Sequence, residues 1–98
     1  MIRQALIVNR KDNVATALRP LERADPIHLE IEGRVCEVTL SEEIPFGHKF
    51  ALSDIEKGGA VIKYGEQIGI ASTMINKGAH VHLHNVEGFR GRGDKGEF

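Results

Sequence analysis

The sequence predicts a small all-β domain with a single modest core, and three observations lead to this prediction. Short apolar segments in the first half of the chain alternate with polar residues, at the period of a strand with one buried face. Glycines recur every few residues after position 44, with short apolar segments between them. No stretch of the 98 residues has the periodicity of a long amphipathic helix. Short strands with frequent turns are typical of a compact, barrel-like or clip-like β unit.

The first half of the chain contains four candidate strands, and the last two form a predicted hairpin. Both strands of this hairpin alternate apolar and polar residues, and Gly33 lies in the short turn between them. His28 falls on the polar face of the hairpin and is expected at the surface. Cys36 stands among apolar residues and is expected in the core. The four candidate strands are residues 5–8, 14–18, 27–31 and 35–40.

An internal repeat marks the second half of the chain. Residues 51–61 and 71–81 share five of eleven positions, and residues 17–27 repeat the same pattern of side-chain sizes more faintly. Each copy is interpreted as one helical turn followed by a strand. Ser53 can cap the free N–H groups of such a turn, and Gly58 can adopt the left-handed conformation that ends it. The repeat therefore predicts a pseudo-symmetric β unit built from paired turn-then-strand elements.

Composition limits the classes of function. The formal net charge of −1 gives no reason to expect a nucleic-acid or acidic-membrane partner. Cys36 is the single cysteine, so one chain cannot form a disulfide or a cysteine-based zinc site. No apolar run approaches the roughly 20 residues needed to cross a membrane, and the N-terminus lacks the pattern of a signal peptide. We therefore expect a cytoplasmic protein, with one domain over residues 1–85 and a glycine-rich, flexible arm over residues 86–98.

Residues 80–85, with the sequence HVHLHN, hold the densest group of ligand-type side chains. Their alternation predicts a strand on which His80, His82 and His84 share one face. Histidines two positions apart on a strand are separated by roughly 6.5–7 Å, so two of them can reach one metal ion together with ligands from elsewhere. Imidazole with oxygen ligands suits iron(II), manganese(II) or zinc. The alternative is a polar strand face at an interface, with the histidines hydrogen-bonded to their neighbours.

Two basic segments are further candidates for binding. In one, Gly47 precedes the pair His48 and Lys49, which can bind a carboxylate or phosphate, and His48 can act as a general base near neutral pH. A solvated turn is equally consistent with this spacing. In the other, Lys63 stands among apolar residues, where it can hold an anionic substrate. The pattern alone favours the alternative, in which its ammonium extends to water.

Six segments of the chain resemble the small domain of the altronate dehydratase family, which also contains galactarate dehydratase and the sulfolactate sulfo-lyases. The resemblance covers most of the chain and implies a β-clip fold of the type called SAF over residues 1–85. Because the chain ends soon after Asn85, it resembles a separate small subunit that acts beside a large catalytic subunit. The matching segments are residues 47–52, 54–55, 57–58, 61–65, 68–69 and 80–85.

The resemblance also implies an activity, which is the removal of water from a sugar acid to give a 2-keto-3-deoxy product. This chemistry is usually supported by iron(II) or manganese(II), and the small subunit can also form homo-oligomers. Two alternatives stay open: a sulfolactate sulfo-lyase small subunit, and a non-catalytic module that binds carbohydrates or carboxylates. The roles implied for the residues are catalysis by His48 and His82, substrate binding by Lys49, Lys63 and Asn85, and metal binding by His80, His82 and His84.

Overall fold

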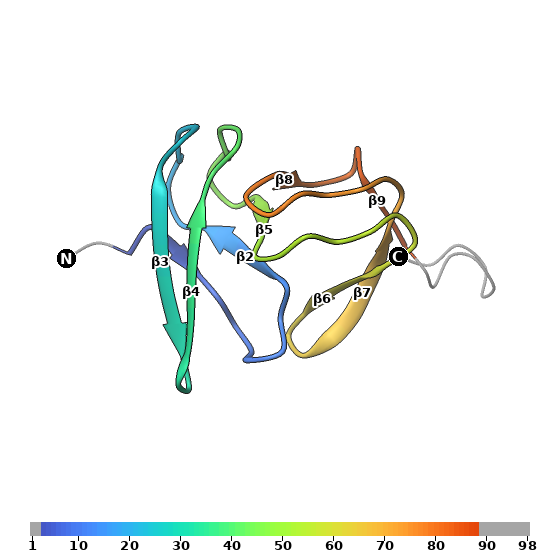
Figure 1. The fold of residues 1–98 in the computed structure, drawn as a ribbon, viewed down its shortest axis with the longest axis horizontal. Coiled ribbons are helices and arrows are strands. Elements are labelled where there is room, and N and C mark those ends of the chain that lie inside the picture. The colour runs from blue at the N-terminus through green and yellow to red at the C-terminus, as the bar shows by residue number, and fades with distance from the viewer. Residues whose placement is uncertain (1–2, 89–98) are drawn as a thin grey trace.

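The computed structural model describes residues 3–88, and the regular secondary structure in that range consists of β-strands (Figure 1). The all-β prediction is therefore confirmed. Within the described residues there is no helix that could cross a membrane. The strands are β1 (Ala5–Leu6), β2 (Val14–Ala17), β3 (Pro26–Ile31), β4 (Arg34–Thr39), β5 (Lys49–Ala51), β6 (Ala60–Lys63), β7 (Glu66–Ala71), β8 (His80–Val81) and β9 (Val86–Glu87).

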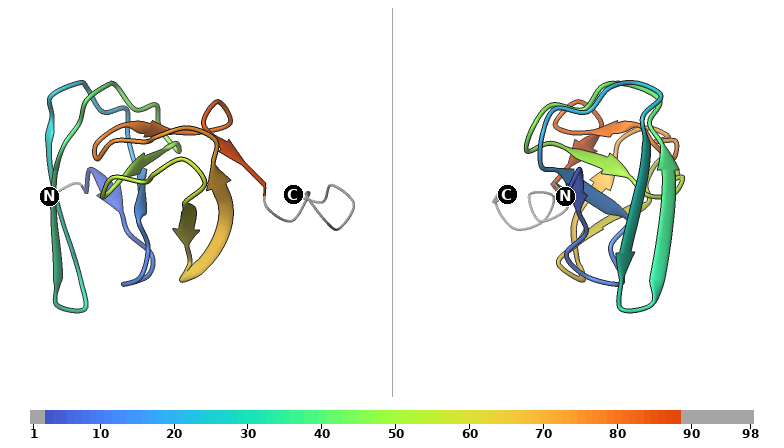
Figure 2. Two further views of the ribbon diagram at one scale, coloured as in Figure 1. Left: turned by 45° about the vertical axis from the view of Figure 1, so that its right-hand side comes forward. Right: turned by 90° about the vertical axis from the view of Figure 1, so that its left-hand side faces the viewer.

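The strands form three antiparallel sheets. The central sheet has the order β1-β2-β5-β8, a second sheet consists of the β3–β4 hairpin, and a third has the order β6-β7-β9. Figure 1 shows the β3–β4 hairpin at one end of the molecule and β6 and β7 toward the other, with β2 and β5 between them. The sheets do not close into a barrel, as the turned views in Figure 2 also show. The structure therefore excludes a closed barrel and leaves the clip-like alternative of the compact β unit predicted from the sequence.

Two clusters of buried side chains lie on opposite sides of the central sheet. Phe50 belongs to the cluster that includes the inner face of the β3–β4 hairpin, whereas its neighbour Ala51 belongs to the cluster beside β6 and β7. Val14 and Ala15 on β2 are divided between the two clusters in the same way. Successive side chains of a strand point to opposite faces, so β2 and β5 contribute to both cores. The central sheet is thus fixed from both sides.

The same backbone conformation occurs four times within residues 3–88. Each copy is a bend, an isolated bridging residue, a tight turn and the start of a strand, at residues 17–26, 40–49, 51–60 and 71–80. Three of these copies are visible in the sequence, but the copy at residues 40–49 is not. The turns hold a residue of positive φ, as in a type II turn, and these residues are Ala24, Gly47, Gly58 and Gly78. The predicted helical turns are therefore wrong. In each copy a single backbone hydrogen bond between residues three positions apart closes the turn, and the successive bonds of a helix do not follow.

The four copies associate as two pairs through reciprocal backbone hydrogen bonds. Ile55 and Ile75 each donate an N–H to the other's carbonyl, at 2.7 and 2.8 Å, and Leu21 and Ile44 do the same at 2.9 Å in both directions. The N–H of each positive-φ residue also bonds to the first carbonyl of the partner copy in all four cases. These bonds make each pair of copies approximately two-fold symmetric, which agrees with the predicted pseudo-symmetric unit.

The β3–β4 and β6–β7 hairpins each close through two residues of positive φ. Glu32 and Gly33 connect β3 to β4, and Tyr64 and Gly65 connect β6 to β7. Two successive residues of positive φ form a type I′ turn, whose twist matches that of the flanking strands. The hairpin predicted around Gly33 is confirmed, and Arg34 is the first residue of its second strand.

The strand predicted over residues 80–85 is wrong, because only His80 and Val81 are extended. Residues 82–85 form a turn that leads into β9, which pairs with β7. The Asn85 side chain accepts the N–H of His82 at 2.9 Å, and this bond favours a turn over a continuing strand. Val86 and Glu87, which the sequence assigned to the arm, form β9, and the rest of the predicted arm from residue 89 onward lies outside the described residues.

The two matching glycines of one pair of copies provide a test of this packing. Gly58 and Gly78 have nearly the same φ, +86° and +88°, but a Cβ would meet nothing at Gly58 and would overlap the Thr39 carbonyl oxygen at Gly78. We expect Gly58→Ala to lower the free energy of unfolding by about 1–2 kcal/mol, the cost of a left-handed alanine. Gly78→Ala should lower it clearly more, as measured by urea denaturation. Equal losses would contradict the close contact between Gly78 and Thr39.

Candidate metal and anion site

Three histidines meet at one end of the β5–β8 pair. Lys49 of β5 lies opposite Val81 of β8, so His48, just before β5, comes opposite His82, just after β8. The ring centroids of His48 and His82 are 3.9 Å apart, and those of His48 and His80 are 5.0 Å apart, with the rings nearly parallel. The antiparallel register of two short strands thus brings together side chains from distant parts of the chain.

The imidazole nitrogens of these residues lie close enough to bind a single metal ion. His48 Nδ1 is 2.8 Å from His80 Nε2, and one ligand nitrogen from each of His48, His80 and His82 lies within 4.8 Å of the others. Ligands held at about 2.1 Å around one ion are separated by about 3 Å when they stand at right angles. Small side-chain rotations would therefore bring the three nitrogens to ligand distances from one ion. Three imidazoles fit iron(II), manganese(II) or zinc.

The structure places His48, and not His84, in this set. His84 is exposed, and its ring is tilted by 39° at a centroid distance of 5.1 Å from His80. The turn after Val81 removes His84 from the strand face on which the sequence placed it. The predicted set of His80, His82 and His84 is therefore brought together only in part, and His48 completes it.

The surroundings of the cluster favour neutral imidazoles. Burial lowers the pKa of His80, and the positive charges of His84 and His48 lower it further, although the carboxylate of Glu42 partly opposes them. Burial also lowers the pKa of His82, followed by the charges of His48 and Lys49. Neutral imidazole is the form that binds metals. Both side chains are therefore in the metal-binding form near pH 7.

Lys49 borders the cluster, and Lys63 lies near Lys49. Burial lowers the pKa of Lys49, and the nearby charge of Lys63 lowers it further. The Lys63 ammonium donates a hydrogen bond to the Tyr64 hydroxyl at 3.0 Å. Lys49 and His82 also line a cavity of about 110 Å³ whose other walls are Ile68, Leu83 and Val86. A partly buried cation beside an apolar pocket can bind the acidic end of a small molecule.

A buried aspartate fixes the hairpin turn that follows Lys63. Asp12 is only 1% exposed, and its carboxylate accepts the N–H groups of Asn9 at 3.0 Å and Gly65 at 2.8 Å. The sequence showed residues 9–13 only as a turn. The contact with Gly65 spans 53 positions, and local patterns carry no signal of such a distant partner.

Asn85 was expected to bind substrate, but both ends of its side chain bond to the backbone. Besides accepting the N–H of His82, its amide donates to the carbonyl of His80 at 2.8 Å, and the residue is only 6% exposed. Asn85 therefore shapes the turn that carries His82.

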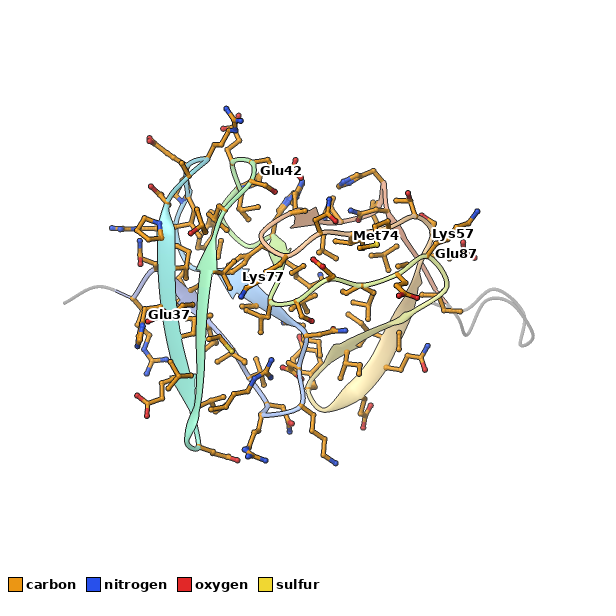
Figure 3. The ribbon with its side chains drawn as sticks, viewed as in Figure 1. Glu37, Glu42, Lys57, Met74, Lys77 and Glu87 are labelled. Carbon is orange, nitrogen blue, oxygen red and sulfur yellow. The ribbon has the colours of Figure 1, made fainter. Side chains whose placement is uncertain are left out.

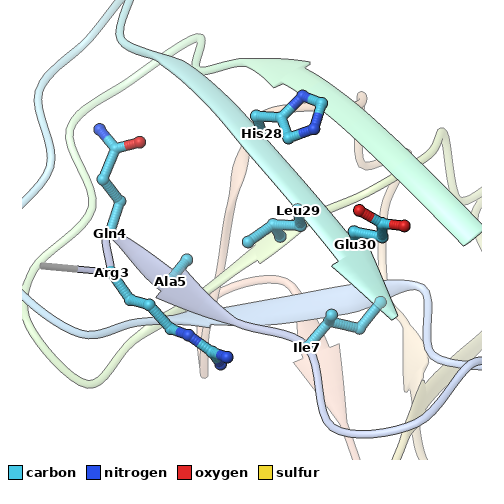
Figure 4. Close-up of a pocket in the computed structure, with 7 residues that line it drawn as sticks. All are labelled: Arg3, Gln4, Ala5, Ile7, His28, Leu29 and Glu30. Carbon is cyan, nitrogen blue, oxygen red and sulfur yellow. The ribbon is translucent and has the colours of Figure 1, made fainter. Parts of the chain in front are cut away.

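A second cavity lies apart from the histidine cluster, between β1 and β3 (Figure 4). Its volume is about 300 Å³, and its polar lining includes Arg3, His28 and Glu30. His28 is exposed, as predicted, and its ring lies 3.1 Å from the carboxylate of Glu37. None of the residues that line this cavity belongs to the cluster.

Comparison with known proteins places these features in a family. Residues 3–88 match the family described as "Altronate/galactarate dehydratase SAF domain". Altronate dehydratase of Escherichia coli (strain K12) is 44% identical over 83 residues, which are 85% of this chain and 16% of that protein. Altronate dehydratase of Bacillus subtilis (strain 168) is 34% identical over 80 residues, which are 82% of this chain and 15% of that protein.

A shorter relative matches about half of the chain's length. The (2R)-sulfolactate sulfo-lyase subunit alpha of Paracoccus pantotrophus is 46% identical over 50 residues, which are 51% of this chain and 75% of that protein. By contrast, the present chain spans about a sixth of the length of the two altronate dehydratases. The family match covers all the described residues, and the chain belongs to the altronate/galactarate dehydratase SAF-domain family.

Proposed function

We propose that this chain is the small subunit of an altronate-type sugar-acid dehydratase and acts with a separate large catalytic subunit. The observation that carries the proposal is the cluster of His48, His80 and His82 beside Lys49. The similarity to altronate dehydratases supports the reaction class. The similarity to a protein named as a sulfo-lyase subunit supports an arrangement in two chains.

The proposed reaction removes water from a sugar acid. A proton leaves the carbon next to the carboxylate, a carbon–carbon double bond forms, and hydroxide leaves the neighbouring carbon to become water. The resulting enol then rearranges to the 2-keto-3-deoxy acid. The difficult features are the weak acidity of that proton and the poor leaving ability of hydroxide, so groups that stabilise negative charge on the substrate accelerate the reaction.

The residues of this chain divide into two tasks in the proposal. His48, His80 and His82 would hold iron(II) or manganese(II), and such an ion, when bound, supplies Lewis-acid stabilisation of charge on substrate oxygens. The Lys49 ammonium would bind the substrate carboxylate, and the charge of Lys63 would add to the attraction. Because His48 and His82 are then metal ligands, the acid and base functions first expected of them are assigned to the large subunit.

A sulfolactate sulfo-lyase small subunit is the second candidate function. It is favoured by the 46% identity to the subunit alpha relative, of which the match covers 75%. The same lysine and metal site would then serve the elimination of sulfite. Assays of the reconstituted complex with altronate and with sulfolactate distinguish the two candidates.

The first prediction concerns the metal ligands. We expect His48→Ala, His80→Ala and His82→Ala each to weaken manganese(II) binding by about 100-fold or more, because each removes a ligand. His84→Ala should stay within about threefold of the parent chain, since its ring lies outside the set. Isothermal titration of the purified chain measures the four affinities. A loss in His84→Ala equal to that of the others would return His84 to the ligand set.

The second prediction concerns the partner. Co-expression with the large-subunit candidate of the same genome should yield a complex that dehydrates altronate only when iron(II) or manganese(II) is present. Chelation should abolish the activity, and added metal should restore it. If the large chain alone were fully active and did not respond to this chain, the small-subunit proposal would fail.

The third prediction concerns substrate binding by Lys49. Replacing it with methionine keeps most of the side-chain length and removes the charge. We expect KM for the sugar acid to rise by about 10- to 100-fold, the effect of losing one hydrogen bond to a charged group. Lys57→Met is the matched control, because the Lys57 side chain is exposed and is not among the residues that line the cavity beside Lys49. A KM unchanged by Lys49→Met would exclude this contact.

A further inference from the structure

We propose that Glu42 is a positioning residue for the histidine cluster, because its carboxylate holds the backbone of His80 in the orientation that directs the imidazole toward His48. Nothing in the sequence pattern marked this residue. The inference rests on the proposed metal site and adds to it a residue that does not itself bind the ion.

The backbone of His80 is held by side chains on both of its polar groups. Its N–H donates to Glu42 Oε2 at 3.0 Å, and its carbonyl accepts the Asn85 amide at 2.8 Å. β8 is the edge strand of the central sheet and is only two residues long. Backbone groups at a sheet edge need partners other than a neighbouring strand. Glu42 and Asn85 provide these partners at His80.

A second contact fixes the segment that carries Glu42. The N–H of Ser41 donates to the carbonyl of Gly78 at 2.9 Å, two residues before His80. Gly78 also lies so close to the Thr39 carbonyl that a Cβ there would overlap it, which shows how closely the two segments pack. Figure 3 shows Glu42 on the connection between β4 and β5, on the side of the molecule where β8 lies. The carboxylate is thus presented to His80 from a firmly placed backbone.

The repeat shows that the fold itself does not require a carboxylate at this position. Glu42 is the third residue of its copy, and the corresponding residues of the other three copies are Arg19, Ser53 and Thr73. All four copies have the same backbone conformation with these different side chains. The bond from Glu42 is therefore particular to the copy that lies against His80.

A metal site depends on such bonds because ligand distances tolerate only about 0.2 Å of error. If the peptide of His80 turned, its imidazole would move relative to His48, which now lies 2.8 Å away between ring nitrogens. Loss of an outer partner of a metal ligand typically weakens metal binding by about 10- to 100-fold.

The test uses cobalt(II) as a spectroscopic probe of the full chain, with three substitutions of Glu42. Glu42→Gln keeps the acceptor oxygen and its reach, so we expect an affinity within about threefold of the parent chain. Glu42→Asp keeps the charge but shortens the reach, and Glu42→Ala removes the acceptor. Both should weaken cobalt(II) binding by about 10-fold or more and alter its visible absorption spectrum. Glu43→Ala, which removes a charge from the same exposed bend, should leave both unchanged.

A readout without metal separates positioning from general destabilisation. In the metal-free chain, the His80 amide should exchange its hydrogen faster in Glu42→Asp and Glu42→Ala than in Glu42→Gln, while the melting temperatures of Glu42→Gln and Glu42→Asp stay similar. Unchanged cobalt(II) affinity in Glu42→Asp and Glu42→Ala would overturn the positioning role alone. An equal loss in Glu43→Ala would also overturn it, in favour of a charge effect. A parent chain that binds no cobalt(II), iron(II) or manganese(II) would overturn the proposed metal site and this inference with it.

Discussion

The reciprocal backbone hydrogen bonds between paired copies are the constraint on which the rest of this structure depends. Most strands here are short, and two- or three-residue strands have little stability of their own. The bridges Leu21–Ile44 and Ile55–Ile75 join the irregular segments directly, and the turn N–H groups bond to the partner copies. Each bend and turn is therefore held by another bend and turn, which satisfies backbone groups that an irregular segment would otherwise leave unpaired.

The candidate site forms where the two pairs of copies meet. His48 ends the turn of the copy at 40–49, and His80 ends the copy at 71–80, which belongs to the other pair. The β5–β8 pairing joins them, and β5 contributes side chains to the buried clusters on both faces of the central sheet. A rigid junction suits a metal or anion site, because ligand groups must keep their positions when the ligand is absent.

The electrostatics of the site combine features that act against each other in the metal-free chain. Burial and the charges of neighbouring histidines lower the pKa values of His80 and His82, and their neutral forms suit metal binding. The positive charge of Lys49, however, disfavours a cation beside His82. An anionic substrate bound between the lysines and the metal would offset this repulsion. The arrangement therefore fits a site in which a metal ion and an acidic substrate bind together.

The sequence by itself determined the local features of this protein. Alternating residues predicted the β3–β4 hairpin, and glycines marked most of the tight turns, because these preferences depend on neighbouring residues and on the φ angles that glycine allows. The repeat and the density of histidines also identified the part of the chain that carries the site. The copy at residues 40–49 escaped notice because its backbone matches the others while its side chains do not.

Only the tertiary structure decided which side chains meet. His48 and His80 are 32 positions apart, and Glu42 and His80 are 38 apart, so no local pattern could join them. One turn that begins after Val81 has two consequences. It removes His84 from the cluster, in which His48 takes its place, and it directs the Asn85 side chain to the backbone. That turn is closed by a backbone bond from the Asn85 N–H to the His82 carbonyl and by the Asn85 side chain, whose preference competes with the strand period of the same residues. The pairing of β8 with β5 and of β9 with β7 decides between a turn and a continuing strand. These pairings cannot be read from the order of residues in the sequence.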